Sequence, residues 1–343
     1  MRITALAGGI GGARFLRGLL AHLSDRDGTS DGTSDGTSDE TVDVTVVGNT
    51  ADDITLFGLR VSPDLDTVMY TLGGGIHEEQ GWGRADETFA VGSELRAYDV
   101  PPDWFTLGDR DIATHIVRTQ LLRNGWPLSD ITTALCERWK PGVHLVPMSD
   151  NPVETHVVID DDAGGRRAVH FQEWWVRLHA QPTAHEFVFL GAAESRPAPG
   201  VVEAIDGADV VLLPPSNPVV SIGAILSVPG IRESLRATRA PVVGVSPIVG
   251  DAPVRGMADA CLTAIGVETS AAAVAAHYGA RRDSGLLDGW LVADDDAHGA
   301  VPPGVVQRAR PLLMTDVPAA AELAGAALQL ALELRDRPRA ATA

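Results

Sequence analysis

Short apolar runs alternate with segments of helical periodicity along most of this chain. Residues 3–7 form an apolar run with the length of a buried parallel strand, and a helical pattern follows it. Further strands are predicted at residues 41–47, 210–213, 241–245, 290–293 and 312–315. Helices are predicted at residues 111–124, 129–138 and 319–334, after Ser221, and around Met257 and Cys261. We expect Ser129 to cap the helix at 129–138 and Pro318 to start the last one.

Strands that alternate with helices predict an α/β fold, with a Rossmann-like parallel sheet and helices on both of its faces. Residues 54–150 read as a mostly helical insertion. A small β-rich lobe is predicted within residues 151–195, with strands at 155–159, 168–173 and 186–190. The expected organisation is a glycine-loop half at 1–150, the β-rich segment, and a second α/β half at 196–343, all within one overall domain.

Composition excludes some classes of function. The net charge of −19, from 27 basic and 46 acidic residues, opposes binding to nucleic-acid phosphates. Lys140 is the only lysine, so a side-chain clamp on one small phosphate ligand must come from arginine. Cys136 and Cys261 stand far apart in apolar contexts, which indicates buried thiols rather than a disulfide.

Because no targeting signal is recognised, we expect a cytoplasmic protein without a membrane partner. No charged and apolar leader opens the chain, and no apolar run is recognised as long enough to span a bilayer. A repeat of Asp-Gly-Thr-Ser occupies much of residues 24–40, where we expect a flexible surface loop between the first helix and the second strand.

Four glycines follow the first predicted strand within five positions: Gly8, Gly9, Gly11 and Gly12. Glycine lets the backbone approach an anion closely, and the helix behind it offers unpaired N–H groups and the positive end of its dipole. The spacing is neither G-x-G-x-x-G nor a Walker loop. A phosphate cradle is therefore the predicted role, and a tight turn without a ligand is the alternative.

Paired carboxylates follow the second predicted strand, at Asp52 and Asp53, and again at Asp64 and Asp66. Neighbouring carboxylates suit Mg²⁺, which shares its oxygen ligands with substrate phosphates, and they also suit general-base work on a hydroxyl. The strand-end location favours a functional role for Asp52 and Asp53 over simple capping. For Asp64 and Asp66, function and capping are balanced.

Other polar loops add candidates with weaker signals. Glycines at 73–75 and the segment 81–88, with Trp82, could shape a pocket for a flat ring, although these residues alone favour a surface loop. Ser216, Asn217 and Ser221 suit either ligand contacts or helix capping, and Arg255 suits either an anion or plain solvent exposure. His156, His170 and His277 read as core histidines, and neither a zinc motif nor a Gly-x-Ser-x-Gly elbow occurs.

With these segments collected, the chain resembles the 2-phospho-L-lactate transferase family of coenzyme F-420 biosynthesis, in its actinobacterial form. The matching segments are 6–16 (LAGGIGGARFL), 63–67 (PDLDT), 70–75 (YTLGGG), 81–83 (GWG), 86–88 (DET), 108–111 (GDRD), 170–177 (HFQEWWVR), 215–223 (PSNPVVSIG) and 255–259 (RGMAD). They span nearly the whole chain outside the repeat. One departure is Ala51, where the family commonly has glycine.

The resemblance implies an Mg²⁺-assisted transfer from lactyl-2-diphosphoguanosine, or its enolpyruvyl relative, to the ribityl hydroxyl of the deazaflavin Fo, with release of GMP. With this chemistry we expect catalysis by Asp52, Asp53 and Asp66; metal binding by Asp52 and Asp53; nucleotide and phosphate contacts from Gly8, Gly9, Gly11, Gly12, Ser216, Asn217, Ser221 and Arg255; and deazaflavin contacts from Asp53, Trp82, Asp86 and Thr88.

Two other classes of function remain open at this stage. Related glycine-loop proteins bind nucleotide sugars as regulators without turnover, although the segment with Trp82 and Asp86 argues against that reading. A nicotinamide dehydrogenase is disfavoured by the glycine spacing. A homodimer is plausible because the chain has many apolar helices.

Overall fold

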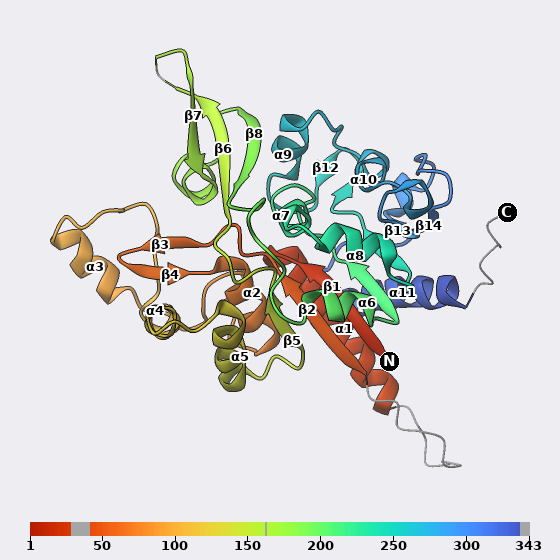
Figure 1. Cartoon of the computed structure of the whole chain (residues 1–343), viewed down its shortest axis with the longest axis horizontal. Coiled ribbons are helices and arrows are strands. Elements are labelled where there is room, and N and C mark those ends of the chain that lie inside the picture. Colours follow the sequence, from red (N-terminus) through yellow and green to blue (C-terminus); the bar gives the residue numbers. More distant parts are fainter. Residues whose placement is uncertain (29–41, 162, 337–343) are drawn as a thin grey trace.

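The computed structural model of the protein describes residues 1–28, 42–161 and 163–336, and its centre is a parallel sheet (Figure 1). The strands of this sheet are β1 (Arg2–Ala7), β2 (Asp43–Gly48), β5 (His144–Pro147), β9 (Val210–Leu213), β10 (Val242–Val245), β13 (Gly289–Val292) and β14 (Val306–Ala309). Their order is β14-β13-β10-β9-β1-β2-β5, and every neighbouring pair is parallel. The chain therefore builds outward from β1 in both directions, as in doubly wound folds.

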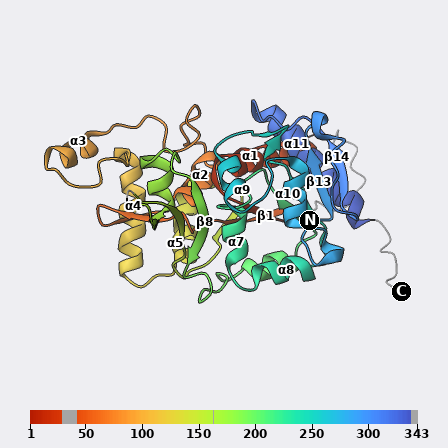
Figure 2. The ribbon, with the colours of Figure 1, turned by 90° about the horizontal axis from the view of Figure 1, so that it is seen from above.

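Helices cover both faces of the sheet (Figure 2). One face carries α1 (Gly9–Gly28), α2 (Pro63–Leu72), α5 (Leu128–Trp139) and α11 (Val317–Arg335). The other carries α6 (Val201–Asp206), α7 (Ile222–Ser227), α8 (Ile231–Ala237), α9 (Ala258–Ala264) and α10 (Ala271–Tyr278). Along β1, Ile3 and Ala5 belong to the first core while Leu6 belongs to the second, because successive side chains of a strand face opposite sides.

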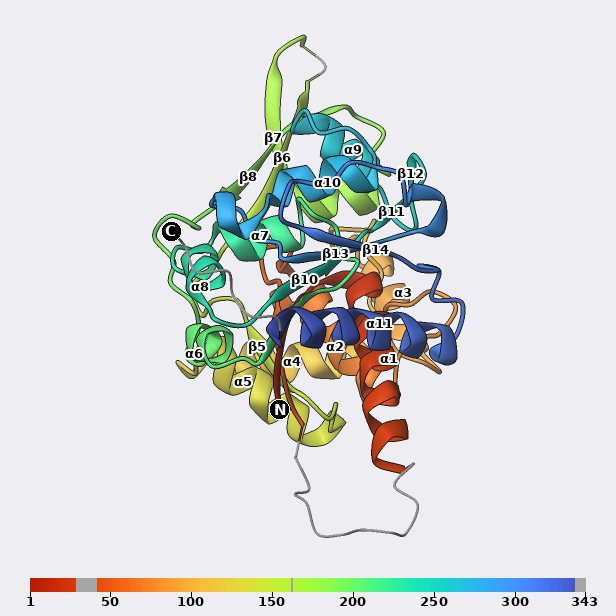
Figure 3. The ribbon, with the colours of Figure 1, turned by 90° about the vertical axis from the view of Figure 1, so that its right-hand side faces the viewer.

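The helices α1 and α11 cross closely (Figure 3). A side chain at Gly18 of α1 would collide with the backbone of Ala320, so glycine permits this approach. By length and composition, α11 is also a candidate to cross a membrane, and it is the one such helix in the described ranges. The expectation that no segment qualifies was therefore wrong. In this fold Ala324, Ala327 and Leu328 of α11 are buried in the core beside α1.

Smaller elements surround the sheet. A hairpin of β3 (Ile54–Leu56) and β4 (Leu59–Val61) lies with α3 (Ala90–Ala97) and α4 (Asp109–Arg123) at one end (Figure 1). An antiparallel sheet, ordered β7-β6-β8, comprises β6 (Glu154–Asp160), β7 (Arg166–His170) and β8 (Ala184–Leu190). The remaining short elements are β11 (Ile248–Val249), β12 (Ala252–Pro253), a π-helix (Glu173–Arg177) and two 3₁₀ turns (Arg281–Asp283, Asp294–Asp296). The predicted fold class, including the helical insertion and the β-rich lobe, is confirmed.

Several local predictions were wrong for identifiable reasons. Residues 312–315 form no strand: the edge strand is β14, and Pro311 cannot donate to a ladder beyond it. The predicted strand at 168–173 ends at His170, because Phe171 and Trp174 then turn into the core on a helical segment. The insertion also contains β3, β4 and β5, which were missed because they are only three or four residues long.

Ser129 was predicted to cap α5, but that helix begins at Leu128 and its N-cap position is Pro127. The Ser129 hydroxyl instead donates to Asp150, at 2.9 Å between Oγ and Oδ2. Cys136 and Cys261 are free thiols, as expected. The proposed flexible loop at 24–40 lies mostly outside the described residues, although α1 itself extends to Gly28. The division of the chain at 150 and 195 stays a prediction.

Candidate functional site

The loops that follow β9, β1 and β2 meet at the carboxyl edge of the sheet. The strand order reverses direction at this point, which is where doubly wound sheets bind ligands. The hydroxyl of Ser216, after β9, donates to the carbonyl of Gly8 at 2.9 Å and accepts from its N–H at 3.3 Å. The structure therefore brings the glycines and the Ser216 loop together, as the sequence predicted.

Three of the four glycines, Gly9, Gly11 and Gly12, form the start of α1, and Gly8 directly precedes it. Gly9 has a left-handed φ of +63°, which favours glycine. A side chain at Gly8 would collide with Asp64, and one at Gly11 would collide with the carbonyl of Pro215. Close packing within the chain thus explains part of this glycine cluster without any ligand. Its role as a phosphate cradle stays a prediction.

Asn49 and Asp64 organise the space beside that helix start, although the sequence left function and capping balanced for Asp64 and no site role was assigned to either residue. The Asn49 amide donates to Asp64 Oδ2 at 2.9 Å and to the carbonyl of Val220 at 3.3 Å, while its oxygen accepts from the N–H of Ala51 at 2.9 Å. The backbone N–H of Gly9 also donates to the Asp64 carboxylate. The pattern Pro63-Asp64, at the start of α2, was the available signal, but capping explained it equally well.

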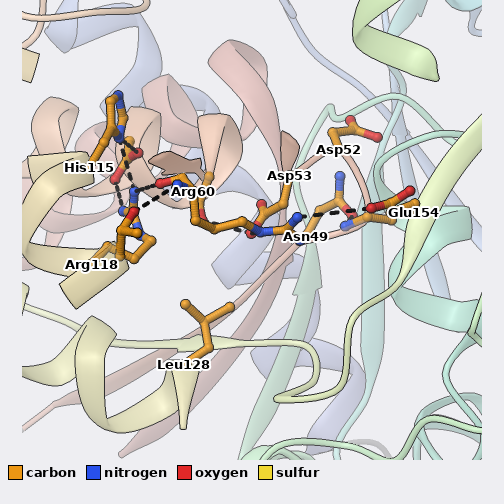
Figure 4. A network of polar contacts seen from close by, with 12 residues as sticks. Asn49, Asp52, Asp53, Arg60, His115, Arg118, Leu128 and Glu154 are labelled. Carbon is orange, nitrogen blue, oxygen red and sulfur yellow. Dashed lines mark hydrogen bonds and ion pairs between the residues drawn. The ribbon is translucent and has the colours of Figure 1, made fainter. Parts of the chain in front are cut away.

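Asp52 and Asp53 are both buried, and their side chains point in different directions (Figure 4). Asp53 Oδ2 accepts from the Ser62 hydroxyl at 2.7 Å and lies 3.5 Å from Arg60 Nε. Asp52 points away from this pair, and the charge of Asp64 raises its pKa. After burial, the negative charge of Asp64 therefore raises the pKa of Asp52 more than the charge of Asp53 does. The binding of one metal ion by Asp52 and Asp53 together stays a prediction.

Burial shifts the titration of all three carboxyl groups upward. It raises the pKa of Asp53 to about 7, against the opposing charge of Arg60, and raises that of Asp64 to about 6. Burial, followed by the negative charge of Asp64, holds the pKa of Asp52 well above its usual range. Several buried carboxyl groups with raised pKa values at one edge of a sheet are typical of a functional site.

The oxygen atoms needed for a divalent cation are available. Among the described residues, Asp52 Oδ1 and Asp53 Oδ1 are buried without a hydrogen-bond partner, and so are the hydroxyls of Thr50 and Thr155. No group of three or more His, Cys, Asp or Glu side chains in the described ranges forms a metal site by itself. Magnesium commonly takes only one or two carboxylates and completes its shell with water and substrate phosphates, so these residues fit that ion.

Asp66 lies in a buried polar network, and its predicted catalytic role stays a prediction. Its Oδ1 pairs with Arg118 of α4, and its Oδ2 is 3.8 Å from His115 Nδ1. His115 Nε2 lies 3.3 Å from Asp111 Oδ2, and Asp111 accepts from the Tyr70 hydroxyl at 2.7 Å. Arg118 is 1% exposed. These contacts favour a structural role for Asp66 in joining α2 to α4. Sequence analysis had no signal for this network, because its partners are far apart along the chain.

The loop at 76–84 lies beside α1 and carries Trp82, one of the four residues predicted to contact the deazaflavin. Trp82 is 51% exposed, which excludes a core tryptophan. A pocket of about 300 Å³ lies here, and its lining includes Trp82, Asp86, Phe89 and Asp111. Thr88 is not part of that lining, and its hydroxyl donates to Asp109 at 2.6 Å. Asp53 does not line this pocket either.

The remaining predicted contacts already have partners inside the chain. Asn217 Oδ1 accepts from the N–H groups of Val219 and Val220 at 2.9 and 3.2 Å, which is a capping arrangement. Arg255 is exposed and donates to the carbonyl of Gln80 at 2.5 Å, so it supports the 76–84 loop. Ser221 is buried beside Gly8. Ligand binding by Asn217, Ser221 and Arg255 stays a prediction.

The acidic cluster predicts an unusual pH dependence of stability in the absence of divalent cations. Between about pH 4 and pH 7 the folded state holds protons on Asp53 and its neighbours that the unfolded state has released, so the free energy of unfolding falls as pH rises. For Asp53 alone the loss is at most about 4 kcal/mol. Urea unfolding with EDTA at about pH 5 and pH 8 measures it, and equal stability for wild type and Asp53→Asn at both pH values would contradict it.

Comparisons with known proteins agree with one another. A family model described as 2-phospho-L-lactate transferase CofD matches residues 3–312. A phosphoenolpyruvate transferase from Thermobifida fusca is 65% identical over 337 residues, covering 98% of this chain and 100% of that protein. One from Streptomyces coelicolor is 62% identical over 339 residues, with the same coverage. A crystal structure of a UPF0052-family protein from Bacillus halodurans has a TM-score of 0.56 at 16% identity, covers 95% of this chain and 99% of its own, and supports the fold alone.

Proposed function

Because this chain belongs to the 2-phospho-L-lactate transferase CofD family, we propose that it transfers a phosphoenolpyruvyl or phospholactyl group from a GDP-linked donor to the deazaflavin Fo. At the coarser level it is a phosphoenolpyruvate or phospholactate transferase of coenzyme F-420 biosynthesis. The names of the relatives favour enolpyruvyl-2-diphosphoguanosine over lactyl-2-diphosphoguanosine as the donor. A cytoplasmic location and a homodimer stay predictions.

One observation carries the chemical part of the proposal: Asp52 and Asp53, which follow β2 at the carboxyl edge of the sheet, each hold a buried oxygen without a hydrogen-bond partner among the described residues. Phosphoryl transfer requires positioning and neutralisation of charge more than a covalent nucleophile. A carboxylate cluster with raised pKa values is unfavourable in the empty protein, and it becomes favourable when a cation and a diphosphate enter together.

Asp52 is the first carboxylate that would hold Mg²⁺, with Asp64 or Asp53 as the second. When bound, the ion supplies neutralisation of the charge that develops on the phosphate oxygens. Asn49 keeps Asp64 oriented toward the helix start through its 2.9 Å hydrogen bond. The first-turn N–H groups of α1, with Ser216 fixed against Gly8, would then lie near the donor diphosphate.

Asp53 would accept the proton of the attacking hydroxyl. The terminal ribityl oxygen of Fo forms a bond to the distal phosphorus of the donor, the P–O bond to GMP breaks, and GMP leaves with the bridging oxygen. Ser62 and Arg60 hold one oxygen of Asp53 and leave Oδ1 free for this proton. Trp82 and Asp86 line the pocket that would receive the flat deazaflavin ring.

The proposal predicts that the protein releases GMP only when Fo, the GDP-linked donor and Mg²⁺ are all present. Release of GMP is followed by chromatography, and the mass of the deazaflavin product distinguishes the enolpyruvyl from the lactyl donor by two hydrogens. Addition of EDTA should abolish turnover if a divalent cation is required. Tight binding of a nucleotide sugar without any product would instead indicate a regulator, and hydride transfer would indicate a dehydrogenase.

A further inference from the structure

A second hollow lies at the edge of the sheet opposite the proposed active site. Its lining comes from α8, from residues 276–285 at the end of α10 and just after it, and from residues 300–302, and its volume is about 570 Å³. These segments precede β10, β13 and β14 along the chain, so they lie at the amino ends of the strands. The candidate active site lies at the carboxyl ends. The two sites therefore do not share residues.

The charged side chains of this hollow are mainly cationic. Arg232 and Arg236, one turn apart on α8, line it together with His277. Within the described part of the chain, neither arginine side chain forms a hydrogen bond or an ion pair. This is notable in a protein that has 46 acidic and 27 basic residues, because a carboxylate partner would be easy to supply.

The two carboxylates near these arginines have other partners. Asp283, which also lines the hollow, lies 3.4 Å from Arg282 Nε. Glu233 accepts from the N–H of Gly230 at 2.9 Å. Burial lowers the pKa of Arg232, and the neighbouring charge of Arg236 lowers it further. The negative charge of Glu233 offsets these two effects only in part, and a bound anion would offset them further.

The rest of the lining suits an organic group attached to that anion. Tyr278 is buried beneath the hollow, with its ring 5.7 Å from the ring of His277. Val301 and Pro302 add apolar surface at one side, and Ser284 adds a hydroxyl. A concave site with an apolar wall and a few convergent polar groups is the usual form of a small-molecule site.

We propose that this hollow binds a small phosphate-bearing metabolite, with Arg232 and Arg236 holding the phosphate and Tyr278, Val301 and Pro302 contacting its organic part. Two arginines one helical turn apart at the rim of one hollow can both donate to the oxygens of a phosphate group. Because the site is separate from the candidate active site, its ligand is a regulator or an accessory ligand rather than the substrate in transfer.

The experiment measures protection of individual arginines in the full-length protein. Wild type is treated with phenylglyoxal, with and without inorganic pyrophosphate or GMP, and the modification rate of each arginine is followed by peptide mass spectrometry. At ten times Kd, pyrophosphate or GMP should slow modification of Arg232 and Arg236 by about tenfold. Arg96, on α3 and exposed, is the control and should react at the same rate throughout.

A comparison of GMP with pyrophosphate, together with variants of Arg232, shows which part of the ligand the hollow binds. Stronger protection by GMP than by pyrophosphate assigns the apolar wall to an organic group, and the reverse result assigns the site to free phosphates. In calorimetry, Arg232→Ala should lose one of the binding events of wild type, and Arg232→Lys should recover it in part. Equal protection by sulfate, or no protection by either phosphate in the millimolar range, would overturn the proposal. If Arg232→Ala does not fold, the protection of Arg232 and Arg236 in the wild-type protein supports or overturns the proposal by itself.

Discussion

Asp53→Asn lowers the rate of GMP release by roughly 10²–10⁴-fold, because the variant keeps the shape of the side chain but cannot accept the hydroxyl proton. Asp53 is fully buried, and its Oδ1 has no hydrogen-bond partner among the described residues, so this oxygen is free for the reaction. The measurement is kcat with saturating donor and Fo. A rate close to that of wild type would reject the role assigned to Asp53.

A stability measurement separates loss of chemistry from loss of structure. Burial raises the pKa of Asp53 to about 7, so the ionised side chain is destabilising above neutral pH in the absence of a cation. Asp53→Asn should therefore be as stable as wild type, or more stable, at about pH 8 while turnover is lost. Asp130→Asn, at an exposed position of α5, is the matched control and should leave both rate and stability unchanged. Unfolding of Asp53→Asn at that pH would invalidate the kinetic comparison.

Arg118→Met destabilises the protein by about 3–5 kcal/mol, because it leaves Asp66 as a buried charge without its partner. In a chain of this size such a loss lowers Tm by roughly 4–7 °C. Thermal or urea unfolding measures it. Arg123→Met on the same helix is the control: Arg123 is exposed and only donates to the carbonyl of Gly58 at 3.3 Å, so its loss should change stability by less than about 1 kcal/mol.

A double variant tests the cause of that destabilisation. Asp66→Asn, added to Arg118→Met, removes the orphaned negative charge and should recover part of the stability. If the double variant is no more stable than Arg118→Met alone, lost packing of the arginine stem explains the effect instead. The single variant Asp66→Asn also tests the catalytic role that the sequence predicted for Asp66, which lies in an ion pair with Arg118. Unchanged kcat in stable Asp66→Asn protein would assign it a structural role alone.

The order of elements was predictable from sequence because it depends on local pattern. Buried strands such as β1 and β9 are apolar runs of the right length, and α11 repeats apolar residues at helical spacing behind Pro318. The right-handed crossover rule then limits the sheet to few topologies. Short strands could not be predicted in this way, because β3 and β4 have three residues each, which is too few to show a period.

The sequence by itself determined the α/β architecture and placed the glycines, Asp52 and Asp53 at one edge of the sheet. Only the tertiary structure decided how these side chains are used. The side chains of Asp52 and Asp53 point in different directions, so Asp53 contacts Arg60 and Ser62 while the charge of Asp64 acts on Asp52. The pairing of Asp66 with Arg118 joins positions far apart in the chain. Such contacts follow from the packing of whole helices and strands, and no local pattern of residues encodes them.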